Sequence, residues 1–93
     1  MNVRFTARAL EDLDDVFDFI SKDSAAFASK TIGELMGVAR TLTKFPYLGR
    51  LYMRPDGVQY RVKVHRNYRI AYQIMSDRIE ILSIQHIARD RAD

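Results

Sequence analysis

Basic side chains stand at every second position from residue 61 to 65, within the run from residue 58 to 65. Arg61, Lys63 and His65 alternate there with apolar residues, so a strand would place all three on one face. Such a row could hold the phosphates of a nucleic acid or the carboxylates of an acidic protein segment. An ordinary solvated strand face has the same pattern, and that alternative stays open.

Two further residues with suitable chemistry follow. Arg69 lies in the string YRIAY, and His86 ends the run IEILSIQH. An imidazole with its ordinary pKa of about 6.5 suits proton transfer, and a guanidinium can stabilise developing negative charge. Structural roles are equally open, because Arg69 could pair with an acidic residue and His86 could cap the end of a strand.

The charge is unevenly distributed along the chain. Residues 1–49 hold six Lys and Arg against seven Asp and Glu, a net charge of −1, whereas residues 50–93 hold nine against five, a net charge of +4. The basic half is also the half that alternates like a sheet. This asymmetry favours an anionic partner.

Length and composition limit the classes of protein. The 93 residues predict one domain, 1–93, and the absence of cysteine excludes a disulfide scaffold, a thiolate metal site and a cysteine nucleophile. The two histidines and Asp90 would be a poor set of metal ligands, so we expect neither metal nor cofactor. No apolar run approaches 18 residues and the start lacks an apolar signal segment, so we expect a cytoplasmic protein without membrane contact.

The first half reads as a short strand followed by two helices. Residues 2–5 alternate briefly and predict an edge strand, and Thr6 can cap a helix over about 7–22. The apolar stripe expected along this helix comprises Leu10, Leu13, Phe17 and Ile20, with Val16 beside them. The other face is acidic, and we expect it to be solvated. It carries Glu11, Asp12, Asp15 and Asp18.

Asp23 or Ser24 can cap a second helix over about 25–44, antiparallel to the first. Gly33 and Gly37 lie one turn apart within it. Each disfavours a helix by about 1 kcal/mol relative to alanine, so we expect them to mark close contact with the first helix. The string FPYLGR ends this helix, and residues 51–57 are expected to form a loop whose tyrosine, methionine and arginine suit a contact surface.

Three strands follow, over 58–65, 68–75 and 78–86, joined by two-residue turns that require antiparallel neighbours. The third has isoleucine or leucine on both faces and is expected to lie inside the sheet. The predicted fold class is therefore α+β: an N-terminal strand and a two-helix hairpin packed on a mainly antiparallel sheet, in the order β-α-α-β-β-β.

Four strings in this order resemble the RelE/ParE superfamily of toxins from type II toxin–antitoxin systems. They are ALEDL from Ala9, FPYLGR from Phe45, YRIAY from Tyr68 and the run from Ile79 to Asp90. The resemblance covers nearly the whole chain. It implies a compact toxin neutralised by an antitoxin whose C-terminal segment wraps around it. It also implies that operator DNA is bound only through the antitoxin.

The resemblance leaves two targets to distinguish. RelE-like and YoeB-like members cut mRNA on the ribosome, whereas ParE-like members poison DNA gyrase. Arg69 and His86 match two residues of the YoeB-like nuclease set, and Arg61 is the further candidate for that chemistry. However, Ile87 stands where those nucleases have a tyrosine, residues 46–58 contain no glutamate, and Lys63 stands alone among arginines.

The incomplete nuclease set favours a ParE-like toxin that poisons gyrase by binding. A ribosome-dependent mRNA interferase is the second hypothesis, and a plain nucleic-acid-binding module is the third. The residues expected to bind the target or the antitoxin are Arg50, Arg54, Arg61, Lys63, Arg69 and Arg89.

Overall fold

A computed structural model describes the chain through residue 90, apart from the side chains of residues 89 and 90. The elements over these residues are β1 (Asn2–Phe5), α1 (Ala7–Ser21), α2 (Ala25–Lys44), β2 (Arg50–Met53), β3 (Gln59–His65), β4 (Tyr68–Ile74), β5 (Arg78–His86) and α3 (Ile87–Asp90). The strands form one sheet in the order β1-β5-β4-β3-β2. Only the β1–β5 pair is parallel, which confirms the predicted α+β fold with a mainly antiparallel sheet and β1 at its edge.

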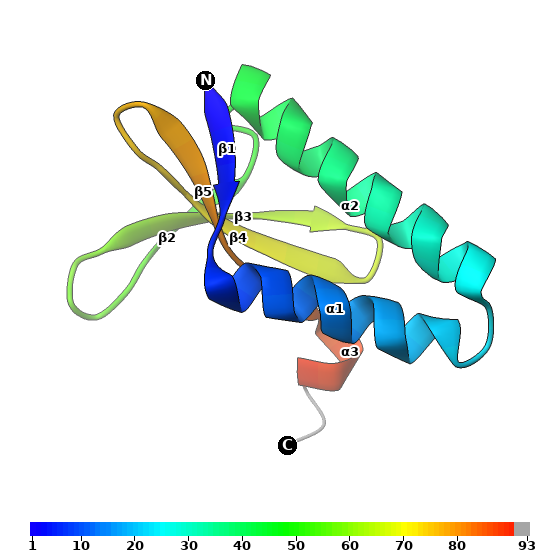
Figure 1. The fold of residues 1–93 in the computed structure, drawn as a ribbon. Helices are drawn as coiled ribbons and strands as arrows, with labels where there is room; N and C mark the ends of the chain where they lie inside the picture. Colours follow the sequence, from blue (N-terminus) through cyan, green and yellow to red (C-terminus); the bar gives the residue numbers. More distant parts are fainter. Residues whose placement is uncertain (91–93) are drawn as a thin grey trace.

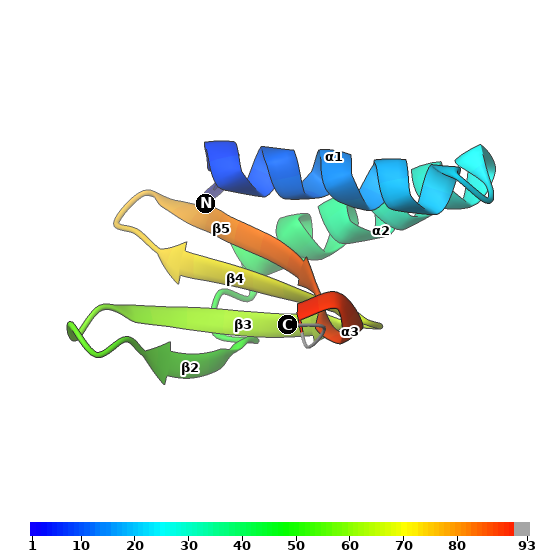
Figure 2. The same cartoon turned by 90° about the horizontal axis from the view of Figure 1, so that it is seen from below.

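The two long helices are joined by a short turn and cover part of one sheet face (Figure 1). In Figure 2, β2 to β5 lie side by side and α1 runs along the β5 side. The buried cluster takes side chains from α1, α2, β4 and β5, but none from β2 or β3. Its largest fully buried members are Tyr72, Leu35, Leu42, Ile70, Ile79, Ile81 and Val16. The β2–β3 end of the sheet therefore lies outside the main core.

Both helices begin where the sequence predicts. The Thr6 hydroxyl accepts the N–H of Ala9 at 3.1 Å and donates to the carbonyl of Leu82 at 3.1 Å, so the cap also ties α1 to β5. The Ser24 hydroxyl caps α2 by accepting the N–H of Phe27 at 3.0 Å. None of the helices in the described part of the chain combines the length and apolar character needed to span a membrane.

The stripe predicted for α1 is partly wrong. Leu10 and Phe17 are 52% and 36% exposed, whereas Ala9, Leu13 and Val16 are buried. The buried set has the same helical spacing but is rotated towards Ala9. Because alanine has a small side chain, α1 can approach β5 closely there. The positions of the largest apolar side chains in α1 therefore did not identify its buried face.

The role predicted for the two α2 glycines is also wrong. A Cβ added at Gly33 would meet nothing within 4 Å, and one at Gly37 would meet only the side chain of Arg40, at 3.6 Å. Neither glycine therefore marks a close contact with α1, and nothing in the structure explains them.

The predicted loop over residues 51–57 begins with a strand. β2 pairs with β3 through Arg50–Met53, and all four of its residues are exposed. The N–H of Arg54 donates to the carbonyl of Val58 at 2.8 Å, and Gly57 adopts a φ of 88° in the turn between the strands. The sequence pattern did not predict β2, because none of the residues of this strand is buried. The strand therefore lacks the alternation of a half-buried strand.

β5 lies inside the sheet, between β1 and β4, as predicted. Only one of its faces is buried, however, through Ile79, Ile81 and Ile84. The register against β4 shifts at Ala71, so that Leu82 is an extra residue in β5.

Candidate functional site

The sheet register divides the predicted basic residues between two faces. Arg61 lies opposite Tyr72, and Lys63 lies opposite Ile70, so both point to the side of the sheet that carries the core. Arg69 lies opposite Val64 and points to the other side. The side of the sheet that the core leaves uncovered therefore carries Arg69 and the valines of β3 rather than the row predicted from the sequence.

His86 lies on the core side as well. It is opposite Tyr68, and the two rings meet edge to face with centroids 5.1 Å apart. Its Nδ1 accepts the backbone N–H of Ala88 at 3.1 Å. The fold therefore does not bring the nuclease candidates together on one surface, because Arg61 and His86 share a side of the sheet that Arg69 does not.

The uncovered face is hollowed into a groove, here called the sheet groove, with a volume of about 370 Å³. Its lining combines apolar residues with basic and polar ones: Arg8, Arg54, Tyr60, Val62, Arg69, Ala71, Leu82, Ser83 and Gln85. Partly buried apolar area surrounded by a few directional polar groups is typical of a site that binds a protein segment or a small ligand.

The arginines of the sheet groove differ in their partners. Arg8 pairs with Asp12 at 3.4 Å and Arg54 with Asp56 at 2.7 Å. Within the part of the chain that the structure describes, Arg69 makes no ion pair. No described carboxylate therefore occupies its guanidinium, a group that binds carboxylates and phosphates well.

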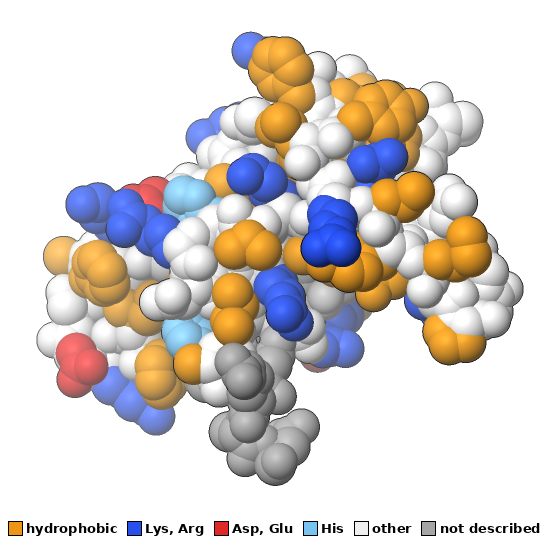
Figure 3. Space-filling model, turned by 180° about the vertical axis from the view of Figure 1, so that it is seen from behind, with side chains coloured by type: hydrophobic (Ala, Val, Ile, Leu, Met, Phe, Trp, Pro, Cys, Tyr) orange, Lys and Arg blue, Asp and Glu red, His pale blue; other side chains and the backbone are white. Residues whose placement is uncertain are grey.

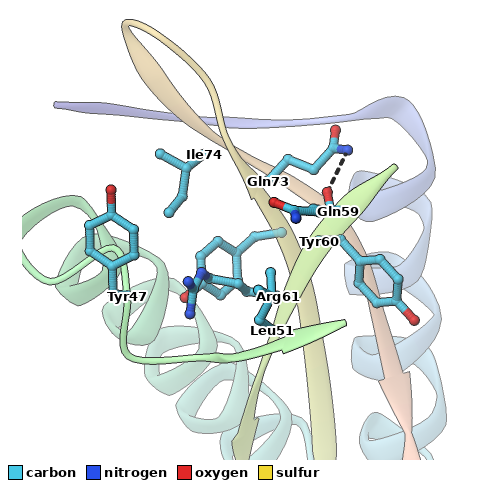
Figure 4. A pocket seen from close by; sticks show the side chains of 8 residues that line it. Tyr47, Leu51, Gln59, Tyr60, Arg61, Gln73 and Ile74 are labelled. Atoms are coloured by element: carbon cyan, nitrogen blue, oxygen red, sulfur yellow. Dashed lines mark hydrogen bonds between the residues drawn. The ribbon is translucent and has the colours of Figure 1, made fainter. Parts of the chain in front are cut away.

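A second hollow, here called the edge pocket, has a volume of about 260 Å³ and lies beside β2 on the other face of the sheet. Figure 4 shows Arg61 reaching from β3 towards Tyr47 across this pocket. The Arg61 guanidinium lies 4.9 Å from the centre of the Tyr47 ring and donates one N–H to the carbonyl of Gly49 at 2.8 Å. The lining residues are Tyr47, Leu51, Gln59, Tyr60, Arg61, Tyr72, Gln73 and Ile74.

The wall of the edge pocket is held by the buried hydroxyl of Tyr72. It donates to the carbonyl of Pro46 at 2.6 Å and accepts the N–H of Gly49 at 2.8 Å. Burial raises the pKa of Tyr72, partly offset by the hydrogen bond from Gly49 and the positive charge of Arg61. The strings FPYLGR and YRIAY are therefore two halves of one hydrogen-bonded structure.

His65 belongs to a different contact. Its Nε2 lies 3.1 Å from Oε1 of Glu34 in α2, and the same oxygen accepts Nε–H of Arg66 at 2.9 Å. The hydrogen bond with His65, followed by that from Arg66, lowers the pKa of Glu34. The β3–β4 turn is thus tied to α2 by residues that the sequence analysis did not pair.

Asp12 was predicted to lie on a solvated acidic face, and this is wrong. Its Oδ2 accepts the backbone N–H of Ile84 at 2.8 Å. β1 pairs with β5 only as far as Ile81, so the carboxylate supplies an acceptor for the next part of that strand edge. The string ALEDL was the available signal, since Ala9 and Leu13 are buried beside Asp12.

The remaining predicted binding residues occupy separate places. Arg50 lies over the ring of Tyr52 at 5.5 Å on β2, and Lys63 is half-buried on β3. Arg89 lies in α3, and its side chain is outside the described part of the chain. Figure 3 shows the side of β2 and β3, where hydrophobic and basic side chains intermingle and acidic ones are few. Among the described residues, no three His, Asp or Glu side chains could hold a metal ion together.

Two solved structures have a similar fold. One is of the chromosomal ParDE system of P. aeruginosa, with a TM-score of 0.77, 21% identity, and coverage of 94% of this chain and 96% of that one. The other is of the toxin–antitoxin complex RelBE2 of Mycobacterium tuberculosis, with a TM-score of 0.68, 22% identity, and coverage of 91% and 95%. At this identity the likeness shows the fold alone.

The sequence comparisons define the family. "Putative toxin Y4kP" of Sinorhizobium fredii is 31% identical over 84 residues, which are 90% of this chain and 85% of that protein. The family described as the ParE toxin of the type II toxin–antitoxin system, parDE, matches residues 3–91. The chain belongs to this family, which confirms the resemblance to RelE/ParE toxins and its ParE-like branch.

Proposed function

We propose that this chain is a toxin that poisons DNA gyrase by binding to it, and that a cognate antitoxin neutralises it by covering the sheet groove. The observation that carries the proposal is the separation of Arg69 from Arg61 and His86 by the sheet itself. Acid–base cleavage of RNA needs its proton donor, acceptor and cation around one phosphate. The sheet groove instead combines apolar area with arginines, as protein-binding surfaces do.

The proposed poisoning of gyrase is tested with purified toxin, gyrase, ATP and plasmid. We expect linear, gyrase-linked DNA, and we expect Arg69→Ala to require at least about tenfold more toxin, since loss of one contact of about 1.4 kcal/mol has that effect. Arg40→Ala on the exposed side of α2 is the matched control and should act like the wild type. Supercoiling that continues at excess toxin would reject gyrase as the target.

The proposal of an antitoxin partner rests on the charge of the second half of the chain and on the shape of the sheet groove. The net charge of +4 over residues 50–93 favours an acidic, amphipathic segment, and so does Arg69, which pairs with no carboxylate among the described residues. Both of the similar solved structures named above are of toxin–antitoxin systems, which supports such a partner. Operator DNA would then be contacted through the antitoxin, and the toxin would act in the cytoplasm as a single domain and inhibit growth.

Binding to the folded toxin should raise its melting temperature, because a ligand of the native state stabilises that state. Differential scanning calorimetry with and without the cognate antitoxin measures this shift. Arg69→Glu should reduce the shift, whereas Arg40→Glu should leave it unchanged. An unchanged melting temperature at saturating antitoxin would contradict the partner.

Ribosome-dependent cleavage of mRNA is the second candidate, and one observation favours it. Arg69 makes no ion pair with a described carboxylate and lies beside Ser83 and Gln85, a set that could hold a phosphate. Translating ribosomes with added toxin would then yield cuts in the ribosomal A site that disappear in Arg69→Ala and His86→Ala. Intact message under these conditions removes this candidate.

A further inference from the structure

Among the described residues, the outer edge of β2 has no strand beside it, because β2 is the last strand of the sheet. All four residues of β2 are exposed, including Leu51, Tyr52 and Met53. Natural sheets usually protect such edges with lysine, proline, a bulge or a covering segment. β2 contains no lysine or proline, so its edge is suited to pairing with another chain.

The hydrogen-bonding pattern identifies the backbone groups at that edge. Arg54, directly after β2, donates its N–H to the carbonyl of Val58, directly before β3, so these two residues continue the β2–β3 register at a hydrogen-bonded position. Such pairs alternate with non-bonded ones in antiparallel strands. The backbone of Arg50 and Tyr52 therefore turns towards β3, and the N–H and C=O groups of Leu51 and Met53 point to the free edge.

The register then connects this edge to the edge pocket. Leu51 lies opposite Arg61, which lies opposite Tyr72, and these three form one row across the sheet. A residue paired with Leu51 on an added strand would continue the row on the same face, about 4.8 Å further out. Its side chain would lie over Leu51 with Arg61 next in the row, within reach of a long guanidinium side chain.

The edge pocket has the chemistry of a carboxylate site. Arg61 is half-buried, and within the described residues it makes no ion pair, since its guanidinium donates only to the carbonyl of Gly49. A partly buried cation is normally matched by an anion, and an arginine can bind a carboxylate through two parallel hydrogen bonds. Tyr47, which is 71% exposed, stacks on the guanidinium and holds it in place.

We propose that the edge pocket binds an Asp or Glu side chain of an extended antitoxin segment that pairs with the free edge of β2. The inference rests on the proposed function in that the partner is an antitoxin. Arg61 is the carboxylate ligand, Tyr47 orients it, and Leu51 and Met53 provide the backbone hydrogen bonds. A nucleic acid fits less well, because a run of phosphates needs a row of cations, whereas this pocket holds one beside an apolar edge.

The test needs neither antitoxin nor gyrase. ¹⁵N-labelled toxin is titrated with acetyl-Val-Glu-Val-amide and with the neutral control peptide acetyl-Val-Gln-Val-amide. The backbone amides and the Arg61 Nε–H are followed by NMR. We expect the Glu peptide to shift Leu51, Met53 and Arg61 together and to bind at least about tenfold more tightly than the Gln peptide. Arg61→Gln should abolish this preference, whereas Arg40→Gln should keep it.

A second variant covers the case in which Arg61→Gln fails to fold. Tyr47→Ala changes an exposed side chain and should weaken the Glu peptide by about two- to fivefold, as expected for a lost cation–π contact. Equal binding of the Glu and Gln peptides overturns the carboxylate site. Tighter binding of acetyl-Val-Val-Val with a free C-terminus, or of single-stranded RNA, at the same residues overturns the side-chain occupant.

The outcomes separate this inference from the proposed function. Peptide binding without gyrase poisoning would support the carboxylate site in the edge pocket and reject only gyrase as the target. Antitoxin binding that is insensitive to Arg61→Gln, together with no preference for the Glu peptide, would reject the edge pocket and leave the sheet groove as the antitoxin site.

Discussion

The hydroxyl of Tyr72 occupies the space that a side chain at Gly49 would need. Gly49 donates its N–H to this oxygen at 2.8 Å, and a Cβ added to Gly49 would lie 2.7 Å from it. The same hydroxyl donates to the carbonyl of Pro46. The chain between α2 and β2 is therefore held against β4, and with it the wall of the edge pocket.

Gly49→Ala should destabilise the protein by about 1–3 kcal/mol, since the new methyl group overpacks a site bounded by the Tyr72 ring and the backbone of Val62. Urea unfolding measures the change in free energy. Gly33→Ala is the matched control, because a Cβ there meets nothing within 4 Å and alanine favours a helix by up to about 1 kcal/mol. Equal effects of the two substitutions would contradict the close packing at Gly49.

Tyr72→Phe should cost about 1–3 kcal/mol, because it leaves the N–H of Gly49 and the carbonyl of Pro46 without their partner. Urea unfolding of the variant and the wild type, at one pH near neutrality, measures this difference. Tyr52→Phe, at an exposed ring on β2, should change the free energy of unfolding by less than about 0.5 kcal/mol.

Tyr72 should also titrate above the usual range of a tyrosine. Its folded-state pKa is raised by burial above the usual value of about 10, so the native state keeps the proton that the unfolded state releases. The stability from neutral Tyr72 is therefore complete below about pH 10 and is lost as the pH rises through the folded-state pKa. Phenolate absorbance should show a group that titrates above about pH 10 and is missing in Tyr72→Phe, and its persistence there would assign the group to another tyrosine.

Asp12→Ala should expose the backbone of β5. The substitution removes the acceptor of the Ile84 N–H and should cost about 1–3 kcal/mol. Hydrogen exchange should then be faster at the Ile84 amide in particular. Asp12→Asn, which keeps a side-chain oxygen, should retain part of the protection, and Asp15→Ala on the exposed side of α1 should change nothing. Unchanged exchange at Ile84 in Asp12→Ala would show that the carboxylate does not protect this strand.

Glu34→Gln should make the free energy of unfolding less dependent on pH in the acidic range. Hydrogen bonds with His65 and Arg66 lower the pKa of Glu34 in the folded state. A carboxyl group with a lowered folded-state pKa contributes stability above its unfolded pKa of about 4.3, and this contribution is lost as the pH falls through the folded value. Unfolding free energies of wild type and Glu34→Gln should therefore differ near neutral pH and converge in acid. The exposed Glu11→Gln serves as control, and a constant difference at all pH values would contradict the coupling.

Much of the fold could be predicted because its signals are local. Thr6 and Ser24 cap helices through their own hydroxyl groups, and the two-residue turns impose antiparallel neighbours. The misassigned side chains have a different origin. Leu10 looked more like a core residue than Ala9, but the close approach of α1 to β5 decides which of them is buried. β2 has no buried residue and is held by its backbone pairing with β3, which side-chain patterns do not reveal.

The candidate site shows the same division. The sequence by itself determined the basic charge of the second half, the four family strings and the incomplete nuclease set. Only the tertiary structure decided that Arg61 faces the core side and Arg69 the uncovered side. The reason is that the core lies between the helices and the β4–β5 part of the sheet, so β3 can turn its cations to that side and its valines to the uncovered side. Alternation along one strand defines two faces, but the packing of distant elements selects the buried one.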